Sequence, residues 1–251
     1  MRLRLDKLLV DRGLVPSRER AQALILAGRV LVNEQKLEKA GANVDGNALV
    51  RILGDDLPYV SRGGLKLAHA LQHWRIAVAG KICLDVGAST GGFTDCLLQA
   101  GAARVMAIDT GHGQMDARLR SDSRVRLLEK TNARYLTVEQ LWGEELPQPI
   151  SLAAMDVSFI SATLVLPAVV GCVRASSALS EMIVLVKPQF EVGREQVGKG
   201  GIVRDEGARL AALAKVAGAV ETLGGSAIEA IPSPILGAEG NREFLLHAAF
   251  A

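Results

Sequence analysis

Residues 85–94, which read D-V-G-A-S-T-G-G-F-T, constrain the fold of this chain more than any other stretch. The apolar residues 82–86 lead into it, and an amphipathic pattern over 93–100 follows and stops at Gly101. An apolar strand, a glycine-rich turn and a short helix, in that order, are typical of the ligand-binding edge of an α/β sheet. The stretch therefore predicts a sheet of alternating strands and helices rather than a helical bundle or a β-sandwich.

The spacing within the turn indicates which ligand it suits. A dinucleotide fingerprint reads G-x-G-x-x-G, and its second glycine lets the backbone approach a pyrophosphate. This chain has Ser89 at that place, and Asp85 puts a carboxylate, which would repel a pyrophosphate, at the strand end. A carboxylate favours a cationic cofactor such as S-adenosylmethionine, which carries an amino group and a sulfonium. A tight turn in the sheet of a hydrolase or dehydrogenase is the alternative, and the motif alone leaves both open.

The rest of the chain continues the same alternation. Further apolar strands are expected at residues 104–108, 125–128, 152–155, 182–186 and 227–231, with a last strand near the C-terminus. An amphipathic helix is expected over 205–223. Strands that alternate with helices predict a mostly parallel, doubly wound, Rossmann-like sheet.

Polar residues follow several of these strands, and the carboxyl ends of parallel strands meet at one edge of the sheet. Asp109 ends the second strand, where an acid commonly accepts hydrogen bonds from a ribose diol. Asn132 follows the third strand and is a candidate contact for an adenine. Together with Asp85, these side chains predict the binding site of a nucleoside-containing cofactor.

Asp156 and Lys187 end the next two strands, and Lys66 lies in the first turn of a helix that follows two glycines. Methyl transfer to a hydroxyl requires alignment of the acceptor and removal of its proton. A neutral lysine amine can accept that proton, an ammonium can stabilise the alkoxide, and a carboxylate can orient both lysines. The alternatives are a helix N-cap for Asp156, a surface ion pair for Lys187 and a solvated side chain for Lys66.

The N-terminal part differs in charge from the rest. Residues 1–54 hold ten Lys and Arg against six Asp and Glu, although the net charge of the whole chain is only +2. Two short helices, the second with Ser17 as its N-cap, and a few short strands predict a compact basic module. Such a module suits a polyanion, while an ordinary solvated surface or an oligomerisation module remains open. The arginines that lie off its apolar stripes are Arg2, Arg4, Arg18, Arg20 and Arg29.

This module resembles the S4 RNA-binding domain. The resemblance is carried by R-L-D-K-L-L at residues 4–9, S-R-E-R-A at 17–21 and G-R-V-L-V-N at 28–33. It implies that the second helix and the following hairpin contact structured RNA. Most of these contacts would be made to phosphates, which position an RNA without specifying its sequence.

Residues 60–250 resemble the FtsJ/RrmJ-like ribose 2′-O-methyltransferases, and with the S4 module the whole chain resembles the TlyA family of rRNA methyltransferases. The carrying stretches, beside 85–95, are S-R-G-G-L-K-L at 61–67, M-D-V-S-F-I-S at 155–161, L-V-K-P-Q-F-E at 185–191 and G-N-R-E at 240–243. The family's Lys-Asp-Lys-Glu tetrad then falls on Lys66, Asp156, Lys187 and Glu243, with Glu239 as an alternative for the last.

The resemblance also implies S-adenosylmethionine as cofactor, a seven-stranded methyltransferase sheet and a cytidine of ribosomal RNA as acceptor. Large-subunit RNA is favoured, because the chain is short at both ends, like members thought to modify only that subunit. Arg62 joins the arginines above as a candidate RNA contact. The implied cofactor-binding residues are Asp85, Gly87, Ser89, Gly91, Gly92, Phe93, Thr94, Asp109, Asn132 and Asp156.

These patterns predict an S4-like domain over residues 1–56, a linker over 57–64 and the methyltransferase domain over 65–251. Three cysteines without C-x-x-C spacing indicate a reducing, cytoplasmic setting and no zinc site, and we expect no metal. No signal peptide or membrane-spanning run is expected. A membrane-active haemolysin and a non-catalytic ribosome-assembly factor are the rival functions, and the oligomeric state is left open.

Overall fold

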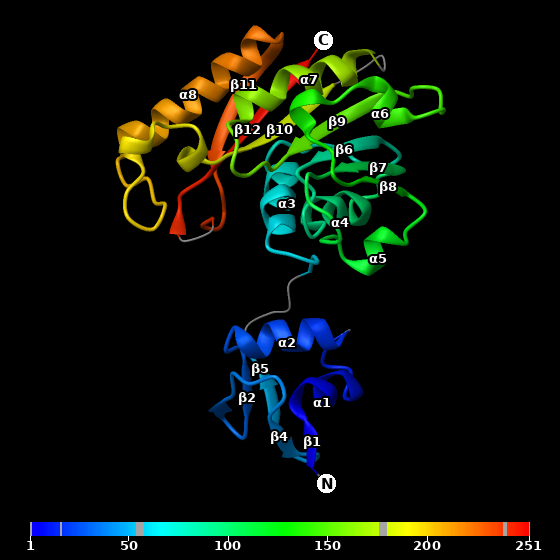
Figure 1. The fold of residues 1–251 in the computed structure, drawn as a ribbon, viewed down its shortest axis with the longest axis vertical. Coiled ribbons are helices and arrows are strands. Elements are labelled where there is room, and N and C mark those ends of the chain that lie inside the picture. The colour runs from blue at the N-terminus through cyan, green and yellow to red at the C-terminus, as the bar shows by residue number, and fades with distance from the viewer. Residues whose placement is uncertain (1, 16, 54–57, 176–179, 238–239, 251) are drawn as a thin grey trace. The chain divides into compact units, whose positions relative to one another are not determined.

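A computed structural model describes residues 2–15, 17–53, 58–175, 180–237 and 240–250 of the chain. The contacts between residues divide the chain into two compact units, Met1–Leu57 and Pro58–Ala251, each of which is drawn in Figure 1. The residues expected to mark the domain boundary, Asp55 and Asp56, and the first residue of the expected linker, Leu57, lie outside the described residues.

The first unit is a small α+β module with its own core. Its helices are α1 (Leu5–Asp11) and α2 (Arg18–Leu26), and its strands are β1 (Arg2–Arg4), β2 (Val30–Val32), β3 (Gln35–Lys36), β4 (Asn43–Asp45) and β5 (Val50–Ile52). Strand β1 pairs with β4, and a separate sheet has the order β3-β2-β5. The hydroxyl of Ser17 accepts a hydrogen bond from Arg20 N at 3.2 Å, which confirms the predicted N-cap of α2. Leu5, Leu9 and Ile25 form the centre of the core.

The second unit is built on a seven-stranded sheet with the order β11-β12-β10-β9-β6-β7-β8. The strands are β6 (Ile82–Val86), β7 (Arg104–Ile108), β8 (Val125–Leu128), β9 (Ile150–Met155), β10 (Glu181–Val186), β11 (Gly225–Pro232) and β12 (Phe244–Phe250). Pairing is parallel from β10 through β8, and β12 runs antiparallel between β10 and β11. This arrangement confirms the predicted doubly wound, mostly parallel sheet.

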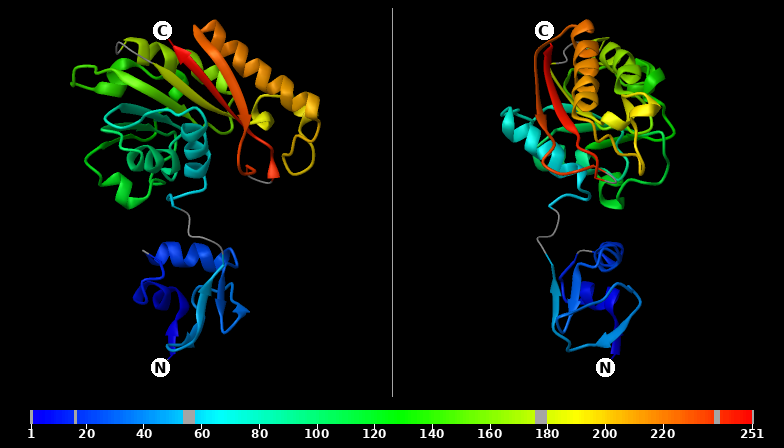
Figure 2. Two further views of the ribbon diagram at one scale, coloured as in Figure 1. Left: turned by 180° about the vertical axis from the view of Figure 1, so that it is seen from behind. Right: turned by 90° about the vertical axis from the view of Figure 1, so that its left-hand side faces the viewer.

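Helices cover both faces of this sheet, as Figures 1 and 2 show. One face packs on α3 (Gly63–His73), α4 (Gly92–Gln99) and the short α5 (Ala117–Arg120), and the other on α6 (Val138–Trp142), α7 (Ala162–Ala175) and α8 (Glu206–Thr222). Successive residues of a strand point to opposite faces, so Leu84 joins one apolar core and Cys83 the other. This burial on both faces explains the nearly continuous apolar runs in the sequence.

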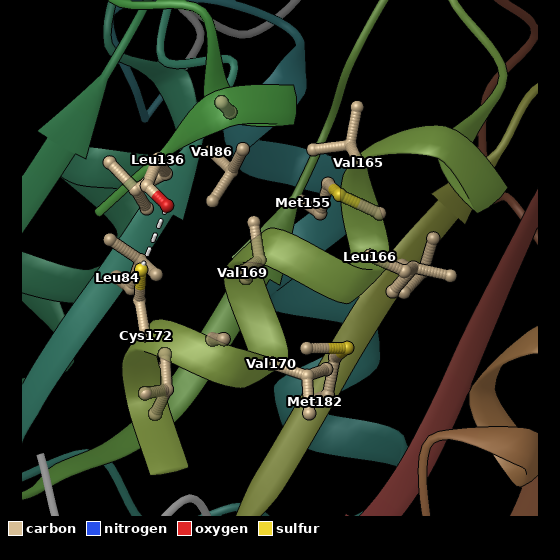
Figure 3. Close-up of a cluster of buried hydrophobic side chains, with 14 of the residues drawn as sticks. Leu84, Val86, Leu136, Met155, Val165, Leu166, Val169, Val170, Cys172 and Met182 are labelled. Carbon is tan, nitrogen blue, oxygen red and sulfur yellow. Dashed lines mark hydrogen bonds between the residues drawn. The ribbon is translucent and has the colours of Figure 1, made fainter. Parts of the chain in front are cut away.

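Helix α7 accounts for the longest uncharged stretch of the chain. Its residues Val165, Val169 and Val173 are buried and, as Figure 3 shows for the first two, lie against the strands β6 and β9. The thiol of Cys172 donates a hydrogen bond to the carbonyl oxygen of Leu136 at 3.1 Å. The stretch therefore contains a core helix. None of the described helices is both long and apolar enough to cross a membrane.

The chain between the two units is anchored on the second one from Pro58 onward. Gln99 Nε2 donates to the carbonyl oxygen of Pro58 at 2.8 Å, and Val60 N donates to Asp95 Oδ2 at 2.7 Å. Both partners lie on α4, and α3 begins at Gly63. Most of the segment expected to be a linker, 57–64, thus packs with the sheet unit.

Candidate active site

Two cavities lie side by side at the carboxyl edge of the sheet, where β6, β7, β9 and β10 end. The larger has a volume of about 600 Å³ and extends from the start of α3 to the segment before β12. The smaller, of about 380 Å³, lies over the ends of β6 and β7. Asp156, which follows β9, lines both, as do Gly87, Ser89, Ser158 and Phe159, so the two cavities adjoin at these residues. Both volumes fall in the range of roughly 300–1,000 Å³ that is usual for small-molecule sites.

The glycine-rich turn after β6 forms the floor between the cavities. Gly87 has a φ of +89° and Gly91 a φ of +95°, which favour glycine. A Cβ on Gly87 would lie 2.4 Å from the carbonyl oxygen of Asp156, so the turn and the residue after β9 are in direct backbone contact. Ser89, at the place of a fingerprint glycine, adopts a φ of +47°. The sequence thus retains the left-handed turn without a glycine there.

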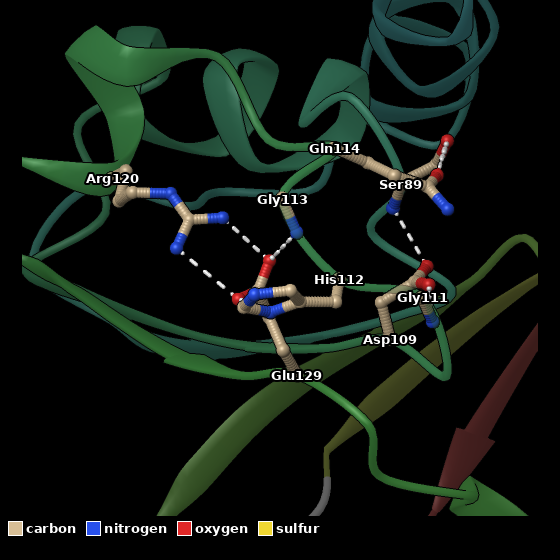
Figure 4. Close-up of polar contacts among 8 residues, drawn as sticks. All are labelled: Ser89, Asp109, Gly111, His112, Gly113, Gln114, Arg120 and Glu129. Carbon is tan, nitrogen blue, oxygen red and sulfur yellow. Dashed lines mark hydrogen bonds and ion pairs between the residues drawn. The ribbon is translucent and has the colours of Figure 1, made fainter.

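Hydrogen bonds from the loop after β7 support that strained turn, as Figure 4 shows. Ser89 N donates to Asp109 Oδ2 at 2.8 Å, and Gly111 N donates to Asp109 Oδ1 at 2.6 Å. The hydroxyl of Ser89 also donates to Gln114 Oε1 at 3.1 Å. A left-handed conformation costs a non-glycine residue about 1–3 kcal/mol, which these bonds offset. Asp109 keeps lone pairs available toward the smaller cavity.

The same loop is held from its other side by Glu129, the residue after β8. Gly113 N donates to Glu129 Oε1 at 2.6 Å, and Arg120 Nη1 donates to Glu129 Oε2 at 3.1 Å. These bonds hold the pKa of Glu129 down to about 2, chiefly through Arg120. Asn132 lines the smaller cavity, and its Oδ1 accepts a hydrogen bond from Arg134 N at 3.0 Å. The loop after β7 and the end of β8 therefore make one braced wall.

Asp85 does not line either cavity. Its side chain is fully buried behind the turn, where Oδ2 accepts a hydrogen bond from Thr94 Oγ1 at 2.6 Å. Its Oδ1 has no hydrogen-bond partner among the described residues. Burial is the main reason why the pKa of Asp85 rises to about 7. The carboxylate therefore acts on the site through the turn and α4 rather than by contact with the cavity surface.

The buried carboxyl group gives a testable dependence of stability on pH. The pKa of Asp85 is about 7 in the folded protein against 3.8 ordinarily, so the folded state holds the proton more tightly. The contribution of Asp85 to the unfolding free energy is largest below the pKa of 3.8 that the group has in the unfolded chain, falls as the pH rises toward 7 and does not change above it. The side chain of the Asp85→Asn variant does not titrate. The unfolding free energy of this variant minus that of the wild type should therefore increase by roughly 4 kcal/mol between pH 4 and pH 8. Urea unfolding across that range measures it, and parallel curves for the two proteins would contradict the assignment.

The other predicted residues of the turn divide between two positions. Gly92 and Phe93, the first residues of α4, line the larger cavity, whereas Gly87 and Ser89 line both. Gly91 faces inward, where a Cβ would lie 2.4 Å from Leu119 Cδ1. It therefore shapes the turn from inside, as Thr94 does through Asp85.

Lys187 and Asp156 form an ion pair in the wall of the larger cavity. Lys187 Nζ lies 2.6 Å from Asp156 Oδ1, although this contact lacks the angles of a hydrogen bond. The ammonium donates its hydrogen bond to Ser158 Oγ, also at 2.6 Å. Lys187 ends β10 and is followed by Pro188, which starts a short 3₁₀ turn, so its side chain is placed by the end of the strand.

Lys66 and Glu243 form a second pair at the opposite end of the same cavity. Lys66 Nζ donates to Glu243 Oε2 at 2.5 Å, and both side chains are buried. This pair explains why a lysine lies in the first turns of α3, where the helix dipole disfavours a cation. All four predicted tetrad residues therefore line one cavity, in two ion pairs. Glu239, the alternative to Glu243, lies outside the described residues.

The sequence reasoning did not single out Phe159, which has the most unusual environment at the site. Its side chain is 92% exposed, and its φ is +64°, a value that is rare for a bulky residue. It lines both cavities, and its ring centroid lies 5.4 Å from that of Phe190. Exposure and backbone strain both cost free energy, which indicates a functional reason for this placement. An isolated Phe between Ser158 and Ile160 gave no signal of this in the sequence.

The arginines of the first unit are partly engaged. Asp6 is fully buried and accepts hydrogen bonds from Arg4 and Arg18, which lower its pKa. These two guanidiniums remain about half exposed. Arg29 donates to the carbonyl oxygen of Leu53 at 2.8 Å. Arg2 is exposed on β1, Arg20 lies in the first turn of α2, and Arg62, in the second unit, is exposed and lines the larger cavity.

The lining of the smaller cavity suits a nucleoside-containing cation. Asp109 and Asp156 both line it, together with Gly87 and Ser89 of the turn. S-adenosylmethionine requires one carboxylate that accepts hydrogen bonds from its ribose diol and another that faces its cationic group. The residues present therefore fit this cofactor.

Comparison with known proteins agrees with this geometry. The sequence model of the FtsJ-like methyltransferase family matches residues 59–250, and that of the S4 domain matches residues 3–50. Over 246 residues the chain is 46% identical to the 16S/23S rRNA (cytidine-2′-O)-methyltransferase TlyA of Mycobacterium tuberculosis, and the match covers 98% of this chain and 89% of that protein.

Two further relatives carry the name of a toxin. Hemolysin A of Brachyspira hyodysenteriae is 40% identical, with 98% of this chain and 99% of that protein covered. A solved structure of a candidate hemolysin from Streptococcus thermophilus matches with a TM-score of 0.74 and 40% identity, and covers all of this chain and 89% of that one. The chain therefore belongs to the TlyA/hemolysin A family, in which an S4 domain precedes an FtsJ-like methyltransferase domain, as the sequence motifs predicted.

Proposed function

We propose that this protein transfers a methyl group from S-adenosylmethionine to the ribose 2′-hydroxyl of a cytidine in ribosomal RNA. The observation that carries the proposal is the larger cavity, in which two lysines and two carboxylates line a space beside the cofactor-shaped one. Support also comes from the name of the Mycobacterium tuberculosis relative, which acts on 16S and 23S rRNA. Ribosomal RNA as substrate would place the activity in the cytoplasm.

In this proposal the two units divide the work. Residues 1–56 bind structured RNA through Arg2, Arg4 and the arginines of α2, and residues 65–251 carry the catalytic site, with 57–64 between them. Asp6 holds two of the guanidiniums in fixed orientations, so less conformational entropy is lost when they bind a phosphate. Arg62, at the rim of the larger cavity, contacts RNA near the reacting nucleotide.

The smaller cavity holds the cofactor. Asp109 accepts hydrogen bonds from the ribose hydroxyls, Asn132 lies at the adenine end, and Gly87 and Ser89 of the turn line the rest. Asp156, at the junction of the two cavities, faces the cationic end. When bound, S-adenosylmethionine supplies an activated methyl group, so the protein has to align the acceptor and remove its proton.

Lys187 either accepts the proton of the ribose hydroxyl or, as an ammonium, stabilises the alkoxide. Its Nζ lies beside Asp156, which lines both cavities. Asp156 and Ser158 fix the position of that nitrogen through the contacts described above. Lys66 supplies a second positive charge that favours an alkoxide. Glu243 holds Lys66 in place and compensates its burial.

Phe159 and Phe190 provide the surface for the base of the acceptor nucleotide. An unstacked base packs on an aromatic ring, which is worth about 1–3 kcal/mol per base. The exposed, strained ring of Phe159 stands at the mouth of both cavities. A cytidine base that packs on it would bring its ribose toward Lys187.

The test is transfer of labelled methyl from S-adenosylmethionine to isolated small and large ribosomal subunits and to their naked RNAs. We expect the label in a single cytidine. The phosphodiester bond on its 3′ side should resist alkaline hydrolysis, because 2′-O-methylation removes the hydroxyl that attacks that bond. The four substrates also show which subunit, and which state of assembly, is used. Label on a base or on protein, or no label on any of the four, would contradict the proposal.

The relatives named as hemolysins give a second candidate, a membrane-active protein. Leakage of dye from phospholipid vesicles that contain the pure protein tests it. Strong leakage by the wild type and by a variant without methyl transfer alike would favour the membrane activity. Methyl transfer without leakage would leave the RNA methyltransferase as the function.

A further inference from the structure

A third cavity, of about 390 Å³, adjoins the larger cavity, which is called the acceptor cavity from here on, and has no role in the proposed reaction. It is bounded by the first two turns of α8, the segment 232–236 after β11, and the start of β12. Glu243 lines both this cavity and the acceptor cavity. A ligand strand in the acceptor cavity can therefore extend past the side chain of Glu243 into the third cavity.

The chemistry of this cavity is unlike that of the other two. Its apolar surface includes Leu210 and Leu236, which are 51% and 52% exposed, and the half-buried Ile235. Exposed leucines that gather around a hollow indicate a binding surface rather than a packing defect. The lining of this cavity is mainly apolar and offers few of the precisely placed polar groups that fix a small metabolite.

Two guanidiniums complete the lining. Neither Arg209, half-buried on α8, nor Arg242, exposed before β12, forms an ion pair with any carboxylate that the structure describes. The carboxylate of Glu243 is already paired with Lys66, and Glu206 is the other acid of the lining. Two arginines against one free carboxylate leave the cavity positively charged, and arginine forks match phosphate oxygens in geometry.

An apolar surface beside unpaired guanidiniums fits one ligand class that the acceptor cavity already implies. A nucleotide offers a flat apolar base and a phosphate. We propose that this cavity is a subsite for a nucleotide that flanks the methylated cytidine in the RNA, with its phosphate bound by Arg209 and Arg242 and its base packed on Leu210 and Leu236. The proposal rests on the proposed function, because it takes the acceptor to be part of an RNA strand.

The subsite is tested with the double variant Arg209→Gln and Arg242→Gln in the full chain. We expect its KM for ribosomal RNA transcripts to rise by about tenfold or more, the effect of losing one charge-assisted hydrogen bond or more. The slope of log affinity against log salt should fall by about 0.7, the contribution of the one phosphate that both arginines bind in a single strand. Leu210→Ser should weaken binding without changing that slope, because it removes packing and not charge. Affinity for S-adenosylmethionine should stay at the wild-type value.

The control is Arg75→Gln, which removes an exposed arginine that lines none of the cavities. It should leave KM and the salt slope unchanged. Filter binding of the same labelled transcripts measures affinity and salt slope without catalysis. If the wild type methylates RNA and the double variant matches it in KM and slope, the subsite is wrong and the proposed function stands. If the wild type transfers no methyl group, but the double variant still shows a smaller slope of log affinity against log salt than the wild type, the subsite stands and the proposed function fails.

Discussion

Lys187→Ala is expected to lower the rate of methyl transfer by about 10²–10⁴-fold, the usual contribution of a general acid or base. Lys187 Nζ lies 2.6 Å from Asp156 Oδ1 in the acceptor cavity, so its loss removes the group that is proposed to act on the acceptor hydroxyl. Binding of S-adenosylmethionine should be retained, because Lys187 does not line the smaller cavity. Single-turnover methyl transfer and equilibrium dialysis of the cofactor measure the two quantities.

A second substitution separates the two roles that a lysine can have. Lys187→Arg keeps the positive charge and hydrogen bonds but cannot release a proton at neutral pH. If it restores transfer, Lys187 acts by charge alone; if it stays inactive, Lys187 acts as the base. Lys81→Ala is the control, because Lys81 precedes β6 and thus lies at the opposite edge of the sheet. Equal labelling by wild type and Lys187→Ala would refute the role of Lys187 altogether.

The sequence predicts the sheet well because its strands are encoded locally. The bounds expected for β6, β7 and β8 agree with the structure residue for residue. Each is a mostly apolar run that a glycine or an acidic residue follows, and such a signal needs no knowledge of distant partners. The reversed direction of β12 is different. β12 lies between β10 and β11 and pairs antiparallel with both, and the local pattern of β12 carries no record of those distant partners.

The catalytic residues show the same division. The sequence places Asp156 and Lys187 at neighbouring strand ends, so their proximity follows from the topology of a parallel sheet. The pairing of Lys66 with Glu243 joins residues 177 positions apart, and it is set by the contact of α3 with β12. Local spacing could not show it, and only the resemblance to the family placed these two residues together.

Asp85 and Phe159 show where local chemistry misleads or is silent. A carboxylate at a strand end suggests an exposed ligand contact, yet Asp85 is fully buried, because its side chain points to the face that α4 covers. The direction follows from the register of β6 against its neighbours. Phe159 looks like a core residue by type, and its exposure results from a left-handed backbone that the sequence does not announce.

The backbone contact between Gly87 and Asp156 gives the second large effect. In Gly87→Ala the new Cβ would lie 2.4 Å from the carbonyl oxygen and 2.9 Å from the carbonyl carbon of Asp156, so the backbone after β9 has to move. Positive φ and overpacking together should lower the unfolding free energy by about 2–6 kcal/mol. A displacement of about 1 Å at a catalytic group costs roughly 10²-fold in rate. We therefore expect loss of methyl transfer even where the variant remains folded.

Gly80→Ala is the matched control for this substitution. Gly80 has a φ of +73°, close to that of Gly87, but a Cβ there would meet nothing within 4 Å. The Gly80→Ala variant therefore bears only the cost of a side chain at positive φ, about 1 kcal/mol, and should keep full activity. Urea unfolding and methyl transfer measured on both variants separate backbone strain from displacement of Asp156. If the two variants lose the same stability and both remain active, the contact does not position Asp156. If only Gly87→Ala is inactive, the turn that shapes the cofactor cavity also sets the position of the acid that the acceptor cavity shares with it.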